Sequence, residues 1–192
     1  MKEFLIVFDI NDTLISKTNK YDRDLLSKFT EEQRNKMYSC NKHLLLKRQY
    51  TEVLVDYLNE HKLDYIFWST SMIHNIKKMI PYLENIGYTF YSGYLSQSDC
   101  EEGTITEKIK ALKSIKNLKQ ACKIFDKKLE NCVLIDNSYE KHVEGQNFIQ
   151  IEDIDHFNED REMIYLVEKI DKFIKCKKDC SVKLLKTKMK SM

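Results

Sequence analysis

Three short apolar runs, rich in β-branched and aromatic residues, stand out along the chain. They are FLIVFD at 4–9, DYIFWS at 64–69 and NCVLID at 131–136. None of them alternates between apolar and polar positions, which is typical of parallel strands that are buried on both faces. A fourth, shorter strand is predicted at FIQIE, residues 148–152.

Amphipathic helices are predicted between these strands. Apolar residues recur at helical spacing over 50–61, 71–87 and 159–175. Gly87 suits the C-cap of the second helix, and Pro81 within that helix predicts a kink or a break. Strands that alternate with helices predict an α/β fold with a parallel sheet, and 192 residues suit one domain.

Each of the three main strands ends on a polar residue, namely Asp9, Ser69 and Asp136. The carboxyl ends of parallel strands form one edge, where such sheets bind ligands, so we expect these side chains to converge. Two carboxylates at one edge repel each other unless a cation lies between them. Mg²⁺ prefers oxygen ligands and often shares phosphate oxygens with them. A carboxylate nucleophile, a hydroxyl and a nearby lysine would together suit phosphoryl transfer through an aspartyl-phosphate.

Four motifs, in order, give the chain a resemblance to a known superfamily. DINDTL at 9–14 resembles the first motif of the haloacid-dehalogenase superfamily, D-x-D-x-T-[LV]. LLLKRQYTEVLVDYL (44–58), YIFWSTSM (65–72) and VLIDNS (133–138) resemble segments of its small C-terminal-domain phosphatases. That branch removes phosphate from serine in the tail of RNA polymerase II and related proteins. The resemblance covers residues 3–174 and implies a Rossmann-like parallel sheet with a minimal cap.

The resemblance also implies roles for single residues. Asp9 resembles the nucleophile, and Thr13 resembles the hydroxyl that supports the motif loop. Ser69, followed by Thr70, resembles the phosphate-binding hydroxyl segment. Arg48 matches the arginine of the family's "KRP" segment and is expected to bind phosphate, although Gln49 stands in place of the proline.

The metal site and the third-motif lysine follow from the same resemblance. Mg²⁺ is expected to bind the Asp9 carboxylate, the Asn11 carbonyl and Asn137, with Asp136 as a ligand or as the group that orients metal-bound water. In KNLKQACKIF, Lys119 aligns best with the family lysine and is expected to act in catalysis and phosphate binding. Lys116 and Lys123 are the alternatives, listed here because lysines are frequent in this segment.

Asn11 occupies the position of the family's general acid and base, an aspartate. An amide forms hydrogen bonds but does not transfer a proton at neutral pH. Three explanations are open: a substitution introduced to trap phosphate or substrate, a slow natural enzyme that uses water or Asp12, or a protein that only binds. Asp12 is expected to point away from the site, because neighbouring side chains diverge at a strand end.

The segments 14–42 and 91–108 are predicted to be insertions near the site. The first is polar and helix-prone, with Thr30 as a capping candidate, and is too small to form a lid domain. An open site suits a phosphorylated protein or peptide better than an enclosed metabolite. The alternatives are a small-molecule or nucleic-acid-end phosphatase, and an inactive phosphatase fold that serves as a protein-binding module.

Charge and cysteine content add expectations about the surroundings of the domain, residues 1–174. Residues 175–192 carry seven Lys and one Asp, and form a predicted basic tail that is solvated or that contacts nucleic acid. The six cysteines lack paired CxxC spacing, which suits free thiols in a reducing compartment. We therefore expect an intracellular monomer, nuclear or cytoplasmic, with no signal peptide and no membrane contact.

Overall fold

The computed structural model describes residues 3–102 and 114–190, with side chains to residue 179, and contains a five-stranded parallel sheet. The strand order is β10-β9-β1-β5-β6, with every pair parallel. The strands are β1 (Leu5–Phe8), β5 (Asp64–Trp68), β6 (Gly93–Leu95), β9 (Cys132–Asp136) and β10 (Phe148–Gln150). The predicted α/β fold is confirmed, and β6 is the one strand of this sheet that the apolar runs did not predict.

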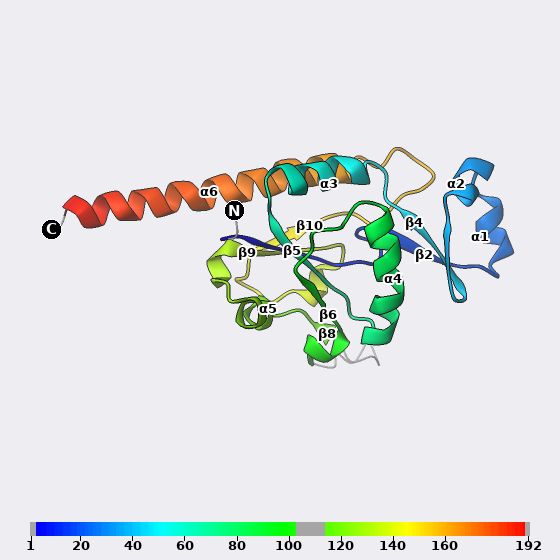
Figure 1. Cartoon of the computed structure of the whole chain (residues 1–192), viewed down its shortest axis with the longest axis horizontal. Coiled ribbons are helices and arrows are strands. Elements are labelled where there is room, and N and C mark those ends of the chain that lie inside the picture. The colour runs from blue at the N-terminus through cyan, green and yellow to red at the C-terminus, as the bar shows by residue number, and fades with distance from the viewer. Residues whose placement is uncertain (1–2, 103–113, 191–192) are drawn as a thin grey trace.

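Helices cover both faces of the sheet (Figure 1). Helices α3 (Thr51–Glu60), α4 (Ile73–Asn85) and α6 (Glu162–Lys190) share an apolar core with one face, whereas α5 (Leu118–Phe125) packs on the other. Helix α4 continues through Pro81, so the expected break does not occur.

Strand β1 explains why the predicted strands lack alternation. Phe4, Ile6 and Phe8 point into the core beneath α3, α4 and α6, and Leu5 and Val7 point into the core beneath α5. Each of these side chains is at most 2% exposed. Both faces of the strand are therefore apolar, as in other sheets that are covered by helices on both sides.

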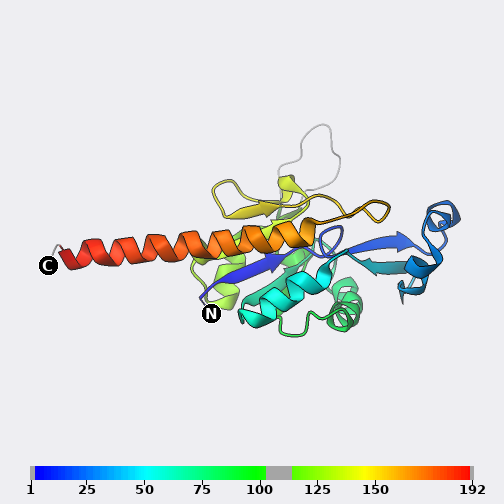
Figure 2. The same cartoon turned by 90° about the horizontal axis from the view of Figure 1, so that it is seen from above.

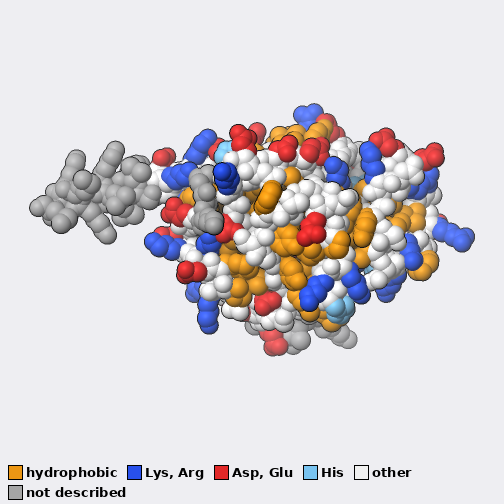
Figure 3. Space-filling model, viewed as in Figure 1, with side chains coloured by type: hydrophobic (Ala, Val, Ile, Leu, Met, Phe, Trp, Pro, Cys, Tyr) orange, Lys and Arg blue, Asp and Glu red, His pale blue; other side chains and the backbone are white. Residues whose placement is uncertain are grey.

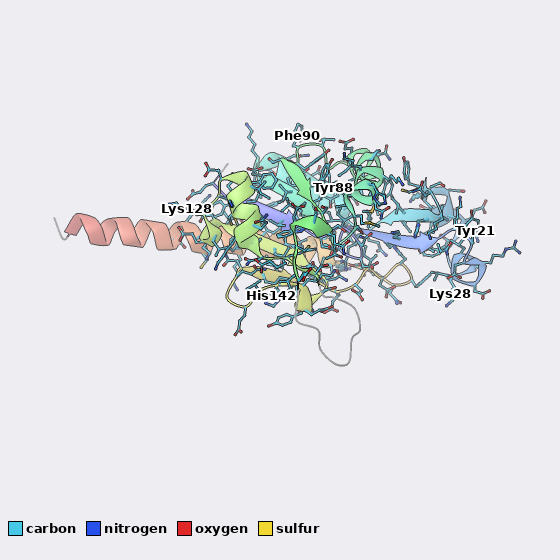
Figure 4. All side chains as sticks on the ribbon, turned by 90° about the horizontal axis from the view of Figure 1, so that it is seen from below. Tyr21, Lys28, Tyr88, Phe90, Lys128 and His142 are labelled. Atoms are coloured by element: carbon cyan, nitrogen blue, oxygen red, sulfur yellow. The ribbon has the colours of Figure 1, made fainter. Side chains whose placement is uncertain are left out.

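An insertion between β1 and α3 forms a separate small sheet. Its strands are β2 (Ile15–Asn19), β3 (Tyr38–Cys40) and β4 (His43–Lys47), which pair antiparallel in the order β2-β4-β3. Helices α1 (Arg23–Ser27) and α2 (Glu31–Asn35) connect β2 to β3, and Thr30 caps α2 as expected. Tyr21 and Lys28 mark the end of this insertion that lies farthest from the main sheet (Figure 4).

The remaining elements are short and lie on connections around the main sheet. They are η1 (Gln97–Asp99), β7 (Glu101–Glu102), β8 (Ser114–Ile115), η2 (Leu129–Asn131) and η3 (Tyr139–Lys141). Strands β7 and β8 form a two-stranded antiparallel sheet. The predicted insertion at 91–108 therefore begins as β6, η1 and β7, and its last part lies outside the described residues.

Helix α6 differs from the sequence prediction in length. A boundary was expected at residue 174, but the helix runs without interruption from Glu162 to Lys190 and projects beyond the sheet (Figure 2). Within the described ranges, the structure holds no helix that is both long and apolar enough to cross a membrane. The face drawn in Figure 3 carries charges of both signs around a group of apolar side chains.

Candidate active site

A buried lysine lies between two buried carboxylates at the carboxyl edge of the main sheet. Lys116 Nζ donates to Asp9 Oδ1 and to Asp136 Oδ2, the second at 2.6 Å, and all three side chains are at most 2% exposed. Asp9 follows β1 directly and Asp136 ends β9, so the parallel pairing of these strands brings the carboxylates together. The predicted convergence of strand ends is therefore present.

The charges of this cluster perturb one another. Burial raises the pKa of Asp9, while the Lys116 ammonium acts in the opposite direction and stabilises the carboxylate. Lys141 Nζ lies 3.4 Å from Asp136 Oδ1. Burial disfavours the charge of Lys141, but the carboxylates of Asp9 and Asp136 outweigh this and raise its pKa. Two cations thus face two anions in a region with little water.

The opposite side of the site is formed by Asn11 and Ser69. Ser69 is 1% exposed and follows β5, and its Oγ accepts hydrogen bonds from Asn11 Nδ2 at 3.3 Å and from the Ser71 amide at 3.2 Å. The amide of Asn11 therefore lies across the mouth of the site from Lys116. Thr70, the neighbour of Ser69, is half-buried on the same loop, and Asp12 is exposed with a left-handed backbone, φ 59°.

Thr13 joins the first motif loop to the loop after β9. Its Oγ1 donates to Asn137 Oδ1 at 3.2 Å and accepts from the Asn137 amide at 3.3 Å, and the side chain is fully buried. Asn137 Nδ2 donates to Asp153 Oδ1 at 2.7 Å. These bonds give Thr13 the supporting position that its resemblance implied, and they fix the direction of the Asn137 side-chain oxygen.

Arg48 has a different surrounding from the one expected of a phosphate ligand. The buried guanidinium pairs with Asp160 at 2.8 Å, and donates to the carbonyls of Thr13 at 3.2 Å and Asp153 at 3.3 Å. Its donors thus bind protein groups beneath the motif loop. The predicted phosphate-binding role of Arg48 is replaced by a structural one, in which it holds two loops and the start of α6 together.

The lysine assignment also needs correction. Lys119, the preferred residue, is exposed on α5, as is Lys123, whereas the alternative Lys116 occupies the site. Asn117 caps α5 through its side chain and thereby sets Lys116 just before the helix. The bond from Gln146 Nε2 to the Lys116 carbonyl at 3.0 Å holds this segment in place.

Three further residues were not predicted from the sequence: Lys141, Asp153 and Asp160. Lys141 follows Asp136 by one short helix, η3, and the neighbouring His142, labelled in Figure 4, forms a bridge with Lys116. Lysines and aspartates are frequent in this chain, so their types alone carried no signal. Asn117 was the usable signal for Lys116, because a good N-cap residue marks the start of a helix.

The oxygen atoms of the site suit Mg²⁺, the metal that the resemblance implies. In the described part of the chain, Asp9 Oδ2 and Asn11 Oδ1 are buried without a hydrogen-bond partner. No group of three His, Cys, Asp or Glu side chains there is placed to hold a metal, so amide and backbone oxygens must complete the set. Asp136 binds Lys116, Lys141 and the Ser138 amide, which favours the orienting role over direct coordination.

Comparisons with solved structures give the same fold. The chain is similar to the fission yeast RNA polymerase II CTD phosphatase Fcp1, in an arginine-to-alanine variant bound to beryllium fluoride, with a TM-score of 0.54 and 13% identity. A second structure of Fcp1, an essential RNA polymerase II CTD phosphatase, matches with a TM-score of 0.55 and 14% identity. Each match covers 91% of this chain, which spans about half of Fcp1, 50% and 48%.

A search of curated proteins found no match to the sequence. A family model, by contrast, covers nearly all of the described domain. The model for NLI interacting factor-like phosphatases matches residues 4–181, which include all four motifs and the cluster around Lys116. The chain therefore belongs to the NLI interacting factor-like phosphatase family, a CTD phosphatase-like branch of the haloacid-dehalogenase fold.

Proposed function

We propose that this protein is a Mg²⁺-dependent phosphatase that acts on phosphoserine in a protein or peptide through an aspartyl-phosphate on Asp9. Asn11, in place of the general acid and base, slows both proton transfers. The observation that carries the proposal is the position of Lys116 between Asp9 and Asp136.

This cluster is poorly explained by fold stability alone. Buried ion pairs lose so much hydration that apolar replacements of similar volume are often equally stable. Charged groups with perturbed pKa values at the edge of a sheet are instead typical of catalytic sites. Family membership supports the same conclusion, since the family is one of phosphatases.

In the first step, a carboxylate oxygen of Asp9 attacks the phosphorus atom and the bond to the seryl oxygen breaks. Lys116 and the Ser69 hydroxyl bind phosphoryl oxygens and offset the charge that develops on them. Mg²⁺, held by Asp9, Asn11 and Asn137, supplies further positive charge when bound. The seryl oxygen must gain a proton as it leaves.

In the second step, water attacks the phosphorus atom, the bond to Asp9 breaks and inorganic phosphate is released. The attacking water must lose a proton. Asn11 lies beside Ser69, where it can orient a substrate oxygen or a water molecule, but its amide transfers no proton. General acid–base assistance typically contributes about 10²–10⁴-fold, so we expect turnover to be reduced by that order.

The open rim supports a protein substrate, because enclosed pockets are usual for small metabolites. The test compares Mg²⁺-dependent phosphate release from a phosphoserine peptide, an aryl phosphate and a 5′-phosphorylated oligonucleotide, with Asp9→Asn as the inactive control. Faster release from the phosphopeptide supports the proposal. Faster release from the oligonucleotide, or activity that persists in Asp9→Asn, contradicts it.

Asn11 favours a second candidate function, a phosphatase fold that binds phosphorylated proteins without releasing phosphate. The same buried cluster would then hold a phosphoserine group as a ligand. This candidate predicts Mg²⁺-dependent phosphopeptide binding together with no turnover, even after Asn11→Asp restores the carboxylate. Turnover in the Asn11→Asp variant excludes it.

A further inference from the structure

A basic pocket lies between the insertion sheet and helix α4, and we call it the lysine pocket. It has a volume of about 280 Å³, and its charged lining consists of Lys17, Lys42, His43 and Lys78. Lys17 belongs to β2, Lys42 and His43 to the turn that enters β4, and Lys78 to α4. No Asp or Glu lines it, so cationic side chains from three elements surround one hollow.

The lysines of this pocket are not neutralised by the protein. In residues 3–102 and 114–190, Lys17, Lys42 and Lys78 form no ion pair with a carboxylate. Two other lysines of the insertion behave differently, since Lys36 and Lys47 each pair with a glutamate, at 2.6 and 2.9 Å. Cations gathered in one hollow repel one another, and an anion bound there would relieve this.

The state of His43 is consistent with a positive potential in the pocket. Its pKa is lowered, first by burial and then by the charges of Lys17 and Lys42. The neutral imidazole can still donate one hydrogen bond. The side-chain amide of Asn75, which also lines the pocket, adds a further donor. The lining therefore offers charge and hydrogen bonds to a group of anionic oxygens.

The pocket is continuous with the proposed active site through two elements. Strand β2 begins at Ile15, whose carbonyl accepts from the amide of Asp12 in the first motif loop at 2.9 Å. Lys17 lies two residues further, on the order of 12 Å from Asn11 by strand spacing and rise. Helix α4, which carries Lys78, begins directly after the loop of Ser69.

We propose that the lysine pocket binds a second phosphoryl group of the same peptide whose phosphoserine occupies the active site. This inference rests on the proposed function. An extended peptide advances about 3.3–3.6 Å per residue, so the two phosphorylated residues would lie roughly three to five positions apart. The small, enclosed set of cations suits a single anionic group better than the continuous backbone of a nucleic acid.

The test measures binding of fluorescent peptides to the full chain with Mg²⁺, by fluorescence anisotropy. The peptides carry one phosphoserine, or a phosphoserine and a second one at +4 or at −4. We compare the protein with Lys17→Gln/Lys78→Gln and with the control Lys36→Gln/Lys47→Gln, which changes the same charge at paired surface positions. All four lysines are exposed, and a melting curve for each variant checks its fold.

The second phosphate should tighten binding about fivefold to tenfold at low ionic strength, because several exposed charge pairs of modest strength form together. This gain should vanish in Lys17→Gln/Lys78→Gln and persist in Lys36→Gln/Lys47→Gln. Equal affinity for all peptides overturns the inference, as does a gain that both double variants retain. Competition for the gain by a single-stranded oligonucleotide stronger than that by the peptide would assign the pocket to nucleic acid and also overturn it.

A further variant separates this inference from the proposed function. Lys116→Met should weaken the peptides with one and with two phosphates by the same factor, since it alters only the active site. If Lys116→Met changes neither affinity while the lysine-pocket variant still abolishes the gain, the proposed active site is wrong and the pocket remains supported.

Discussion

The buried pair of Arg48 and Asp160 gives the sharpest prediction about stability. Both side chains are at most 3% exposed, and Arg48 also donates to two backbone carbonyls. Arg48→Met keeps most of the buried side-chain volume but leaves the Asp160 carboxylate without its cation. Removal of one partner of a buried pair costs about 3–5 kcal/mol, which for a domain of this size lowers Tm by roughly 6–20 °C.

The assay is thermal unfolding followed by circular dichroism, combined with a double-mutant cycle. Asp160→Asn is the matched variant, because it removes the charge and keeps the side-chain oxygen that accepts from the Glu162 amide at 3.1 Å. Arg48→Met/Asp160→Asn should lose less stability than the two single changes added together. A Tm within about 2 °C of the parent, accompanied by loss of phosphopeptide binding, would restore the phosphate-binding role of Arg48.

Three other outcomes are expected. Lys116→Met should abolish aryl phosphate turnover and phosphopeptide binding, whereas Lys119→Met, on the exposed face of α5, should leave both within about twofold, since surface changes have small effects. Asn137→Ala should weaken the increase in Tm that Mg²⁺ produces, because a ligand of the folded state alone stabilises by mass action; an unchanged increase would contradict its role. Burial lowers the pKa of His156, which contacts Ser16 of the insertion, so the folded protein favours the neutral ring. Stability should therefore fall as pH drops below about 6.5, and urea titrations of His156→Gln should show a weaker fall.

The main sheet was predictable because its strands are buried on both faces. Such strands read as continuous apolar runs, and four of them were placed within about two residues. The insertion strands were not predicted as strands. In β2, ISKTN buries only Ile15 and Thr18, so polar residues dominate and hide the β pattern. The short β6 carries glycine and was missed for the same lack of an apolar run.

The site was predictable where a residue ends a main-sheet strand. Asp9, Ser69 and Asp136 have positions that the sheet topology fixes, so local sequence was sufficient. Lys116 comes from a loop held by long-range bonds, and alignment with the motif favoured Lys119, one helical turn further on. Arg48 pairs with a residue more than a hundred positions away, which no local pattern reveals.

The central claim is that Asp9 accepts the phosphoryl group and that Asn11 cannot support its release. An aryl phosphate has a leaving group that needs little protonation, so the first step should proceed in this chain while hydrolysis lags. The direct measurement is intact-protein mass after rapid acid quench of the protein with Mg²⁺ and aryl phosphate. We predict a fraction that carries one added phosphoryl group, absent in Asp9→Asn, and replaced in Asn11→Asp by turnover raised about 10²-fold or more. No added phosphoryl group, together with unchanged turnover in Asn11→Asp, would contradict the account.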